Sequence, residues 1–528
     1  MTIYRSRLPV RALAPFALLF ASLAHAQLTD QTQTPNLERA GIAKSLQEEI
    51  GTGVGDWVTP GSSSFIIARD PARSIRRGRQ LFQRKFTLLQ GVGPRTHDGI
   101  GDIEAEGALG AGLVESCAGC HGRPRGAAGF GGDVATRPDS RDAPHLFGLG
   151  LQEMLADEIT TDLRAIRDNA RIQARQAGQP VTRKLVAKGI RYGVIRAFPD
   201  GNFDTSGVRG VNSDLRVRPF FAQGATTSIR EFIVGALNDE MGLQAVDPLL
   251  TRAAAGQRVV TPGGMVLDGS LDLVQAPRAK SATEDPDNDQ VFNEIPTSLV
   301  DHMEFYLLNY FKPGIYRQTA VTRAGELLMK QTGCTACHVQ DLVINSDRRV
   351  ADVETSYDRQ LGIFNGLYAT ASLLVTEEDD RSGYPTIKRP LRKPFVVRNF
   401  FADMKRHDLG PEFHERNYNG TLTTEFMTEP LWGVGSTPPY GHDGRSINLR
   451  EVILRHGGEA RLSRNLFAAM PDISKTAIIE FLNTLVLFPP DDTASNLDPG
   501  DPNAPGYPQR GHGSIRLPVL FNDPTELE

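Results

Sequence analysis

The sequence predicts a mainly α-helical protein with two similar domains. Three observations lead to this prediction: a short cysteine and histidine motif that occurs twice, a helical segment before each copy, and a later helix that ends each repeat at proline. The motif has the form C-x-x-C-H and lies at Cys117–His121 and at Cys334–His338. These two copies contain all four cysteines of the 528-residue chain.

Two helices are expected to flank each motif. Arg76–Phe82 precedes the first copy and Arg323–Met329 precedes the second. Ser298–Phe311 and Ser474–Phe488 follow them, each with a Glu-Phe pair at the same offset from its serine. Both closing helices should stop at the prolines that come next, because proline cannot continue a helix.

The C-x-x-C-H motif is typical of covalent c-type haem attachment, in which two thiols add to the haem vinyl groups and the histidine binds the iron. A C-x-x-C pair also occurs in redox disulfides and zinc sites. The adjacent histidine in both copies, with no spare cysteine, favours haem. Helices crossing beside such a motif form the framework of a cytochrome c domain, so we expect two cytochrome c-like domains with one haem each. The predicted attachment residues are Cys117, Cys120, His121, Cys334, Cys337 and His338.

The N-terminus has the features of a secretory signal peptide. A basic segment precedes an apolar run, Ala12–Leu23, and an A-x-A cleavage site ends at Ala26. We therefore expect a periplasmic or secreted protein without a membrane span, since spanning needs about 20 apolar residues in a row. Removal of residues 1–26 would change the formal net charge from −5 to −8, because three arginines and no acids are lost. This modest acidity argues against a nucleic acid partner.

The predicted domains follow from these boundaries. Residues 27–312 form an N-terminal cytochrome c domain with insertions, 313–490 form the C-terminal one, and 491–528 form a tail rich in Pro, Gly and Asp. The first domain contains a charged helical segment, Asp157–Ala177, and an alternating segment, Lys184–Gly210, that predicts a small β-hairpin insertion.

A third histidine stands out in the second domain. Asn448 and Glu451 are spaced as a capping box, and the short helix that they begin ends at Gly457-Gly458. His456 therefore lies at the end of this helix. Spacing alone is equally compatible with an iron ligand and with a simple interaction with the negative helix end.

Several segments resemble the bacterial di-haem cytochrome c peroxidase superfamily. They are Phe426–Gly435, Tyr440–Gly444 and Leu449–Glu451; Phe401–Met404, His407–Gly410 and Ile453–Ala460 resemble its di-haem oxidoreductase branch in particular. In the peroxidases, a methionine at the end of the matching helix binds the electron-donating haem. His456 occupies that position here, so the resemblance implies a bis-histidine, low-spin second haem of low potential.

The resemblance places the chemistry at the first haem. Arg141 stands where the peroxidases have a loop histidine that caps the iron, which implies an open iron; His145, four residues later, is an alternative ligand. Glu240 matches a family glutamate and is the candidate acid/base that moves a proton between the two oxygens of peroxide. Glu153 is a second candidate for that role.

Two positions depart from the peroxidase pattern. The family's tryptophan between the haems falls on Ala222, and its distal glutamine falls on Phe232. An apolar distal pocket resembles that of the rubber oxygenases, which are di-haem relatives that hold dioxygen and cleave polyisoprene. The polarity of the distal pocket helps to decide between these reactions.

Reduction of hydrogen peroxide is the leading hypothesis, with electrons from a small redox protein or a quinone-linked donor. An oxygenase that uses dioxygen is the enzymatic alternative, and a di-haem electron-transfer cytochrome is the third. Relatives also hold a calcium ion between the domains, so the resemblance implies calcium as a further cofactor. No ligand cluster in the sequence demands that ion.

Overall fold

The structure is a computed structural model. It describes residues 58–93, 115–121, 142–310, 314–315, 318–357, 367–381, 383, 386–417, 420–486 and 515–516, without the side chains of 353–372 and 515–516. The predicted signal peptide, Arg141 and nearly all of the predicted tail lie outside the described residues.

The first group of helices surrounds the first motif. It contains α2 (Ser63–Arg69), α3 (Pro71–Gln83), α5 (Cys117–His121), α7 (Ile229–Met241), α8 (Pro248–Ala254) and α9 (Thr297–Leu308). Helices α3 and α9 cross closely and share one apolar core. At the crossing, a side chain at Gly78 would clash with the carbonyl oxygen of His302. Glycine therefore allows the two backbones to meet.

The second group repeats this arrangement. It contains α10 (Ala320–Gln331), α12 (Leu449–Arg455), α13 (Arg461–Ala469) and α14 (Asp472–Leu482). Helices α10 and α14 cross, and a side chain at Gly325 would clash with the carbonyl oxygen of Ala477. Strands β6 (Gly314–Ile315) and β17 (Leu485–Val486) pair and bring the two ends of this group together. The predicted flanking helices are thus present around both motifs.

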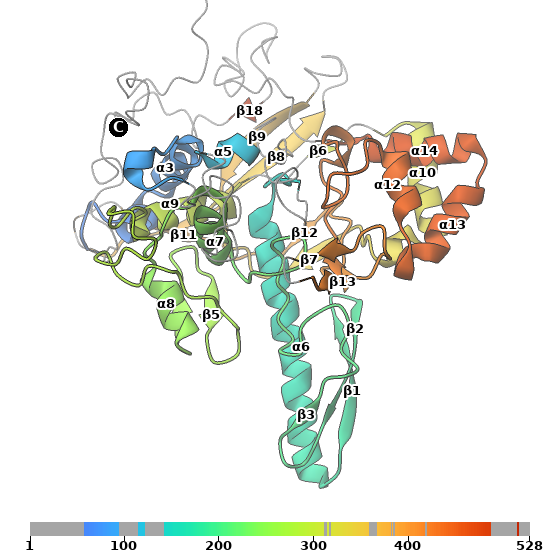
Figure 1. Ribbon diagram of the computed structural model, residues 1–528, viewed down its shortest axis with the longest axis horizontal. Helices are drawn as coiled ribbons and strands as arrows, with labels where there is room; N and C mark the ends of the chain where they lie inside the picture. Colours follow the sequence, from blue (N-terminus) through green and yellow to red (C-terminus); the bar gives the residue numbers. More distant parts are fainter. Residues whose placement is uncertain are drawn as a thin grey trace, which may run out of the picture.

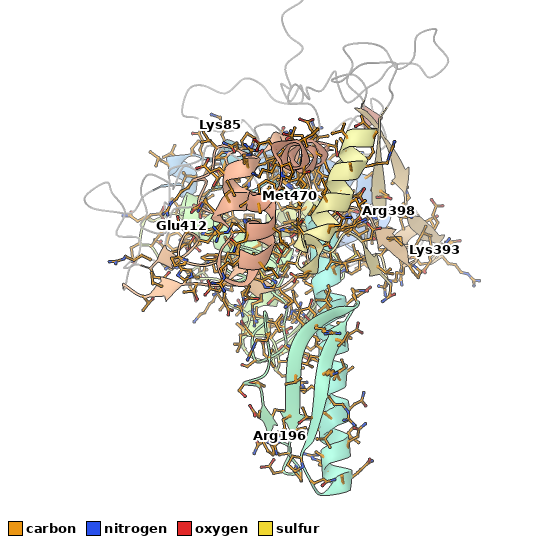
Figure 2. The ribbon with its side chains drawn as sticks, turned by 90° about the vertical axis from the view of Figure 1, so that its right-hand side faces the viewer. Lys85, Arg196, Lys393, Arg398, Glu412 and Met470 are labelled. Atoms are coloured by element: carbon orange, nitrogen blue, oxygen red, sulfur yellow. The ribbon has the colours of Figure 1, made fainter. Side chains whose placement is uncertain are left out.

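A long arm projects between the two groups (Figure 1). It consists of helix α6 (Leu149–Ala177) and an antiparallel sheet of β1 (Val181–Ala187), β2 (Ile190–Ala197) and β3 (Phe203–Asp204). Figure 2 shows the hairpin lying along α6, with Arg196 on the outer part of the arm. The alternate residues Leu185, Tyr192 and Ile195 are buried in one cluster with Ile159 of α6. The predicted hairpin is therefore an amphipathic sheet that covers a helix.

The remaining strands form several small sheets. They are β4 (Arg258–Val260) with β5 (Val266–Asp268), β7 (Leu342–Ile344) with β12 (Phe395–Val397), β8 (Ala351–Tyr357) with β9 (Leu367–Leu373) and β18 (Ile515–Arg516), β10 (Val375–Glu378) with β11 (Ile387–Pro390), β13 (Arg406–His407) with β16 (Phe426–Met427), and β14 (Glu415–Arg416) with β15 (Leu422–Thr423).

The prediction of a mainly α-helical fold is wrong. The structure contains 38% helix and 16% strand, which makes it a mixed α/β fold and not a mainly α pair of cytochrome c-like domains. Most of the unpredicted strands lie in residues 342–427, between the second motif and α12. Many of them have only two to four residues, which is too short for a period-two pattern to be recognised in the sequence.

Among the described residues, none of the helices has both the length and the apolar character needed to cross a membrane.

Candidate functional site: two haem attachment segments

Each C-x-x-C-H motif forms a single helical turn. The first is helix α5, and Cys117 packs against the apolar core of the first helix group. The second begins with a 3₁₀ turn, Cys334–Ala336, and Cys334 packs against the core of the second group. Burial raises the pKa of the Cys117 thiol to about 12 and also raises the pKa of Cys334. A redox-active C-x-x-C pair usually has a lowered thiol pKa. The raised pKa values at these two motifs therefore do not favour a redox disulfide.

The two motif histidines have the same hydrogen-bond arrangement. Nδ1 of His121 donates to the carbonyl oxygen of Pro144 over 2.7 Å, and Nδ1 of His338 donates to that of Phe401 over 2.9 Å. Burial lowers the pKa of both imidazoles, which keeps them neutral at neutral pH. A neutral imidazole that donates from Nδ1 presents the lone pair of Nε2, as an iron ligand must. The donor sets at both motifs therefore fit a haem.

His456 has the geometry of a second ligand at the second motif. Asn448 caps α12 by accepting a hydrogen bond from the Glu451 amide over 2.9 Å, and His456 follows the last helical residue. Its Nδ1 donates to the carbonyl oxygen of Val452 over 2.7 Å, which again leaves Nε2 for a metal. Burial is the main cause that lowers the pKa of His456 to about 4, and His338 is near enough to contribute to this shift.

Apolar side chains gather beside the second motif. The cluster beside Cys334 contains Leu431, Val434, Tyr440, Ile453 and Met470 as partly buried members. Phe413 meets the His456 ring edge to face, with centroids 5.4 Å apart. Apolar surroundings and two neutral imidazoles fit a bis-histidine haem, so the residues present are compatible with the ligand pair that the resemblance implies.

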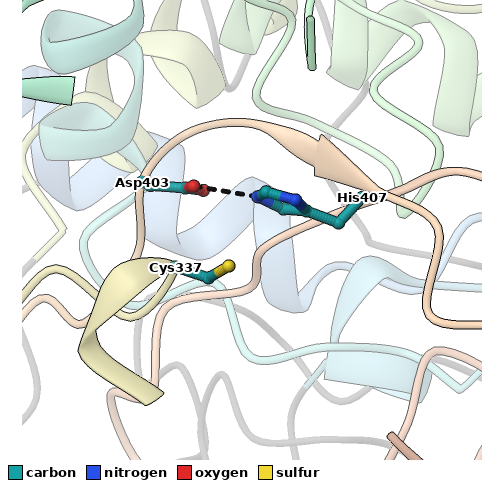
Figure 3. A group of neighbouring side chains, drawn as sticks. All are labelled: Cys337, Asp403 and His407. Carbon is teal, nitrogen blue, oxygen red and sulfur yellow. Dashed lines mark hydrogen bonds and ion pairs between the residues drawn. The ribbon is translucent and has the colours of Figure 1, made fainter. Parts of the chain in front are cut away.

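A polar cluster lies beside the second motif (Figure 3). The buried ring of His407 bonds Asp403 through Nε2 over 2.8 Å and Glu459 through Nδ1 over 2.9 Å. Burial opposes protonation, but hydrogen bonds with Asp403 and Cys337 raise the pKa of His407 to about 11. Cys337, Asp403 and His407 have converging donor atoms, as a metal site would. Both ring nitrogens of His407 already have carboxylate partners, which indicates a structural role for this histidine.

The residues expected on the far side of the first haem are only partly located. Phe232, in α7, packs against Phe220 and Phe221, with ring centroids 5.8 and 5.2 Å apart. It borders the same apolar core as Cys117. Glu240 is half-buried in the last turn of α7, two turns beyond Phe232. The structure thus brings Phe232 toward the attachment motif and places Glu240 near the C-terminal end of the same helix.

The two alternative residues of the first domain are occupied by other partners. His145 donates from Nε2 to the carbonyl oxygen of Trp432 over 2.7 Å and accepts the Phe147 amide at Nδ1 over 3.2 Å. It directly follows Pro144, whose carbonyl oxygen accepts the hydrogen bond from His121. Glu153 is buried in α6 and accepts hydrogen bonds from the Ile229 amide and Arg348, over 2.8 and 2.6 Å.

A group of three carboxylates is the nearest approach to a calcium site among the described residues. Oxygens of Asp285, Asp287 and Asp289 lie within 4.8 Å of one another. Asp285 accepts the amides of Asp289 and Gln290, and Asp289 accepts that of Val291. These bonds organise a turn, and such acidic turns are common without an ion.

A family of known proteins matches part of the chain. Residues 340–485 match the family described as "Di-haem oxidoreductase, putative peroxidase". The matched segment begins two residues after His338 and includes Phe401, His407 and His456. It supports the family to which the sequence resemblance pointed, at the level of a di-haem oxidoreductase. No curated protein matches the chain.

Proposed function

We propose that this protein is an exported di-haem oxidoreductase that reduces hydrogen peroxide at its first haem. The observation that supports this most is the difference between the two attachment segments. The second motif has His456 as a further imidazole with a free Nε2, whereas His145, beside the first motif, has both ring nitrogens engaged. An iron with two protein ligands can relay electrons, and an iron with one protein ligand has a free position for a substrate. An enzyme with an internal electron relay needs one iron of each kind.

The second site is proposed as the relay. With His338 and His456 as ligands, it has no position for a substrate, and its apolar wall excludes water. Two histidine ligands favour a lower potential than one histidine and one methionine. The residues of this site therefore suit electron storage and transfer.

The first site is proposed as the reactive one. Haem iron would supply the centre at which peroxide takes up two electrons and two protons to give two waters. Glu240 would hold the proton that passes from the inner to the outer oxygen. Arg141 would leave the far side without a histidine cap, and Phe232 would keep it apolar. The electrons would come from a small redox protein or a quinone-linked donor.

The export signal is part of the proposal. Cleavage near Ala26 would release the chain to the periplasm or the exterior, where c-type haems are attached in bacteria.

Use of dioxygen is the second candidate, and one observation favours it. Phe232 is part of an aromatic group with Phe220 and Phe221. A far side lined by these rings lacks a hydrogen-bond donor for peroxide, and an apolar pocket stabilises neutral dioxygen better than a charged intermediate.

Low-temperature EPR of the ferric protein, followed by a peroxide turnover assay with a small electron donor, tests the proposal. One high-spin and one bis-histidine low-spin signal, with turnover, are expected. The same spectrum without turnover but with a stable dioxygen adduct would favour the oxygenase. Two low-spin signals and no ligand binding would favour an electron carrier.

A further inference from the structure

Trp432 lies between the two attachment segments. It is only 3% exposed and belongs to the apolar cluster at the base of the arm. The chain has one other tryptophan, Trp57, which lies outside the described residues. Contacts of Trp432 reach toward both attachment segments.

Toward the first site, Trp432 makes two contacts. Its carbonyl oxygen accepts the Nε2–H of His145 over 2.7 Å. Its ring packs against Gly148 so closely that any side-chain carbon at Gly148 would clash with it. His145 directly follows Pro144, whose carbonyl oxygen holds Nδ1 of His121.

Toward the second site, the contacts are equally direct. The Trp432 ring meets the ring of Phe400 at 73°, with centroids 5.0 Å apart. The amide of the preceding residue, Leu431, donates to the Phe400 carbonyl oxygen over 3.2 Å. Phe400 is followed by Phe401, whose carbonyl oxygen holds Nδ1 of His338. The carbonyl groups that orient the two ligand histidines thus belong to Pro144 and Phe401. Each of these residues is the chain neighbour of a residue that contacts Trp432.

We infer that Trp432 is a positioning residue shared by both haem sites, and this inference rests on the proposed two-haem arrangement. Its ring and its backbone carbonyl group hold the two carbonyl acceptors in place, so the imidazole planes of His121 and His338 are set by one residue. The orientation of a ligand imidazole affects the electronic state of the iron, and a hydrogen bond at its other nitrogen tunes its basicity. A change at Trp432 should therefore reach both irons.

The test compares variants of the haem-loaded full chain by EPR and resonance Raman spectroscopy. Trp432→Leu removes the ring and should shift the signals of both haems. Trp432→Phe keeps an aromatic face toward Phe400 and should stay close to the wild-type protein. Phe400→Leu should change mainly the second haem, and His145→Phe, which cannot donate to the Trp432 carbonyl group, mainly the first.

Ile159→Ala is the matched control, because Ile159 is fully buried in the same apolar cluster. It should lower the melting temperature without moving either haem signal. The inference is overturned if Trp432→Leu changes one haem only, or if Ile159→Ala produces the same spectral changes. The wild-type spectrum tests the proposed function separately: two low-spin signals would reject the open first haem, while the variant comparison would still decide the role of Trp432.

Discussion

At the residue scale, the three candidate ligand histidines obtain their orientation in different ways. The carbonyl acceptor for His456 is Val452, four residues earlier in the same helix. Those for His121 and His338 lie 23 and 63 residues away. The position of His456 is therefore a local property of its helix, and sequence spacing could indicate it. The acceptors Pro144 and Phe401 depend on long-range packing and have no sequence signal of their own.

Replacement of His456 tests its assignment directly. His456→Gly should abolish the low-spin signal of one haem, because the iron loses its second imidazole. His456→Met should keep a six-coordinate iron and raise its midpoint potential, since a thioether favours the reduced state. EPR and redox titration measure these effects. His414→Gly is the control, because the His414 ring bonds Asp408 near the surface. An unchanged signal in His456→Gly would refute the assignment of His456 as a ligand.

His407 should contribute a pH-dependent part of the stability. Its folded-state pKa, about 11, lies above the ordinary value of 6.5, so the protonated form is favoured by folding. The stability that it supplies is fully present below pH 6.5 and is lost as pH rises toward 11. His407→Phe leaves Asp403 buried without this partner, which costs about 3–5 kcal/mol for a buried ion pair.

Denaturant unfolding of the wild-type protein and of His407→Phe at pH 6 and pH 10 measures this contribution. The difference between the two proteins should be larger at pH 6. Glu459→Gln, which keeps a hydrogen-bond acceptor for Nδ1, should have a smaller effect. An equal difference at both pH values would show that His407 is not protonated in the folded protein.

At the element scale, the two crossings of α3 with α9 and of α10 with α14 show how far helix prediction reaches. Helical spacing located all four helices, but the closing helices α9 and α14 end at Leu308 and Leu482, before the prolines that were expected to stop them. Gly78 and Gly325 occupy equivalent places in their helices, and both meet a carbonyl group of the crossing helix. The repeat was visible in the sequence, but the reason for its glycines is a tertiary contact.

Gly325→Ala tests that contact. The added methyl group must displace the backbone of α14, and such overpacking costs about 1–3 kcal/mol. Gly235→Ala, in the middle of α7, is the matched control, because open space surrounds that position. It should be neutral or stabilising by about 1 kcal/mol, since alanine favours helix more than glycine does. Thermal or denaturant unfolding measures the stability of both variants. Equal effects of the two substitutions would show that α10 and α14 are not tightly packed where they cross.

At the scale of the whole molecule, buried ion pairs join segments that are far apart in the chain. In the first half of α6, Glu153 binds Arg348, and Asp157 binds both Arg216 and Arg348. Helix α6 therefore ties the segment after the second motif to the first helix group. Another cluster joins α7, α8 and α9: the fully buried Arg230 binds Asp247, Asp301 and Glu304 over 2.6–2.8 Å.

Glu304 should make this second cluster sensitive to pH. Burial, partly offset by Arg230, raises its pKa from 4.5 to about 7. A raised pKa means that the stabilising contribution is complete below pH 4.5 and is lost as pH rises through 7; the shift corresponds to about 3 kcal/mol. Glu304→Gln should therefore flatten the dependence of unfolding free energy on pH between 5 and 8.

The control is Glu326→Gln, which changes a surface pair with Lys330 and should leave that dependence unaltered. A wild-type protein whose stability did not fall between pH 5 and 8 relative to Glu304→Gln would contradict the assignment.

Patterns among neighbouring residues were enough to predict the local features of this protein: the two attachment motifs, the flanking helices, the hairpin of the arm and the place of His456 at a helix end. Each depends on residues close together in the chain. The tertiary structure decided the short strands of residues 342–427, the partners of His407 and the place of Trp432. These features arise when distant segments pack against one another, and neither residue type nor spacing records which segments will meet.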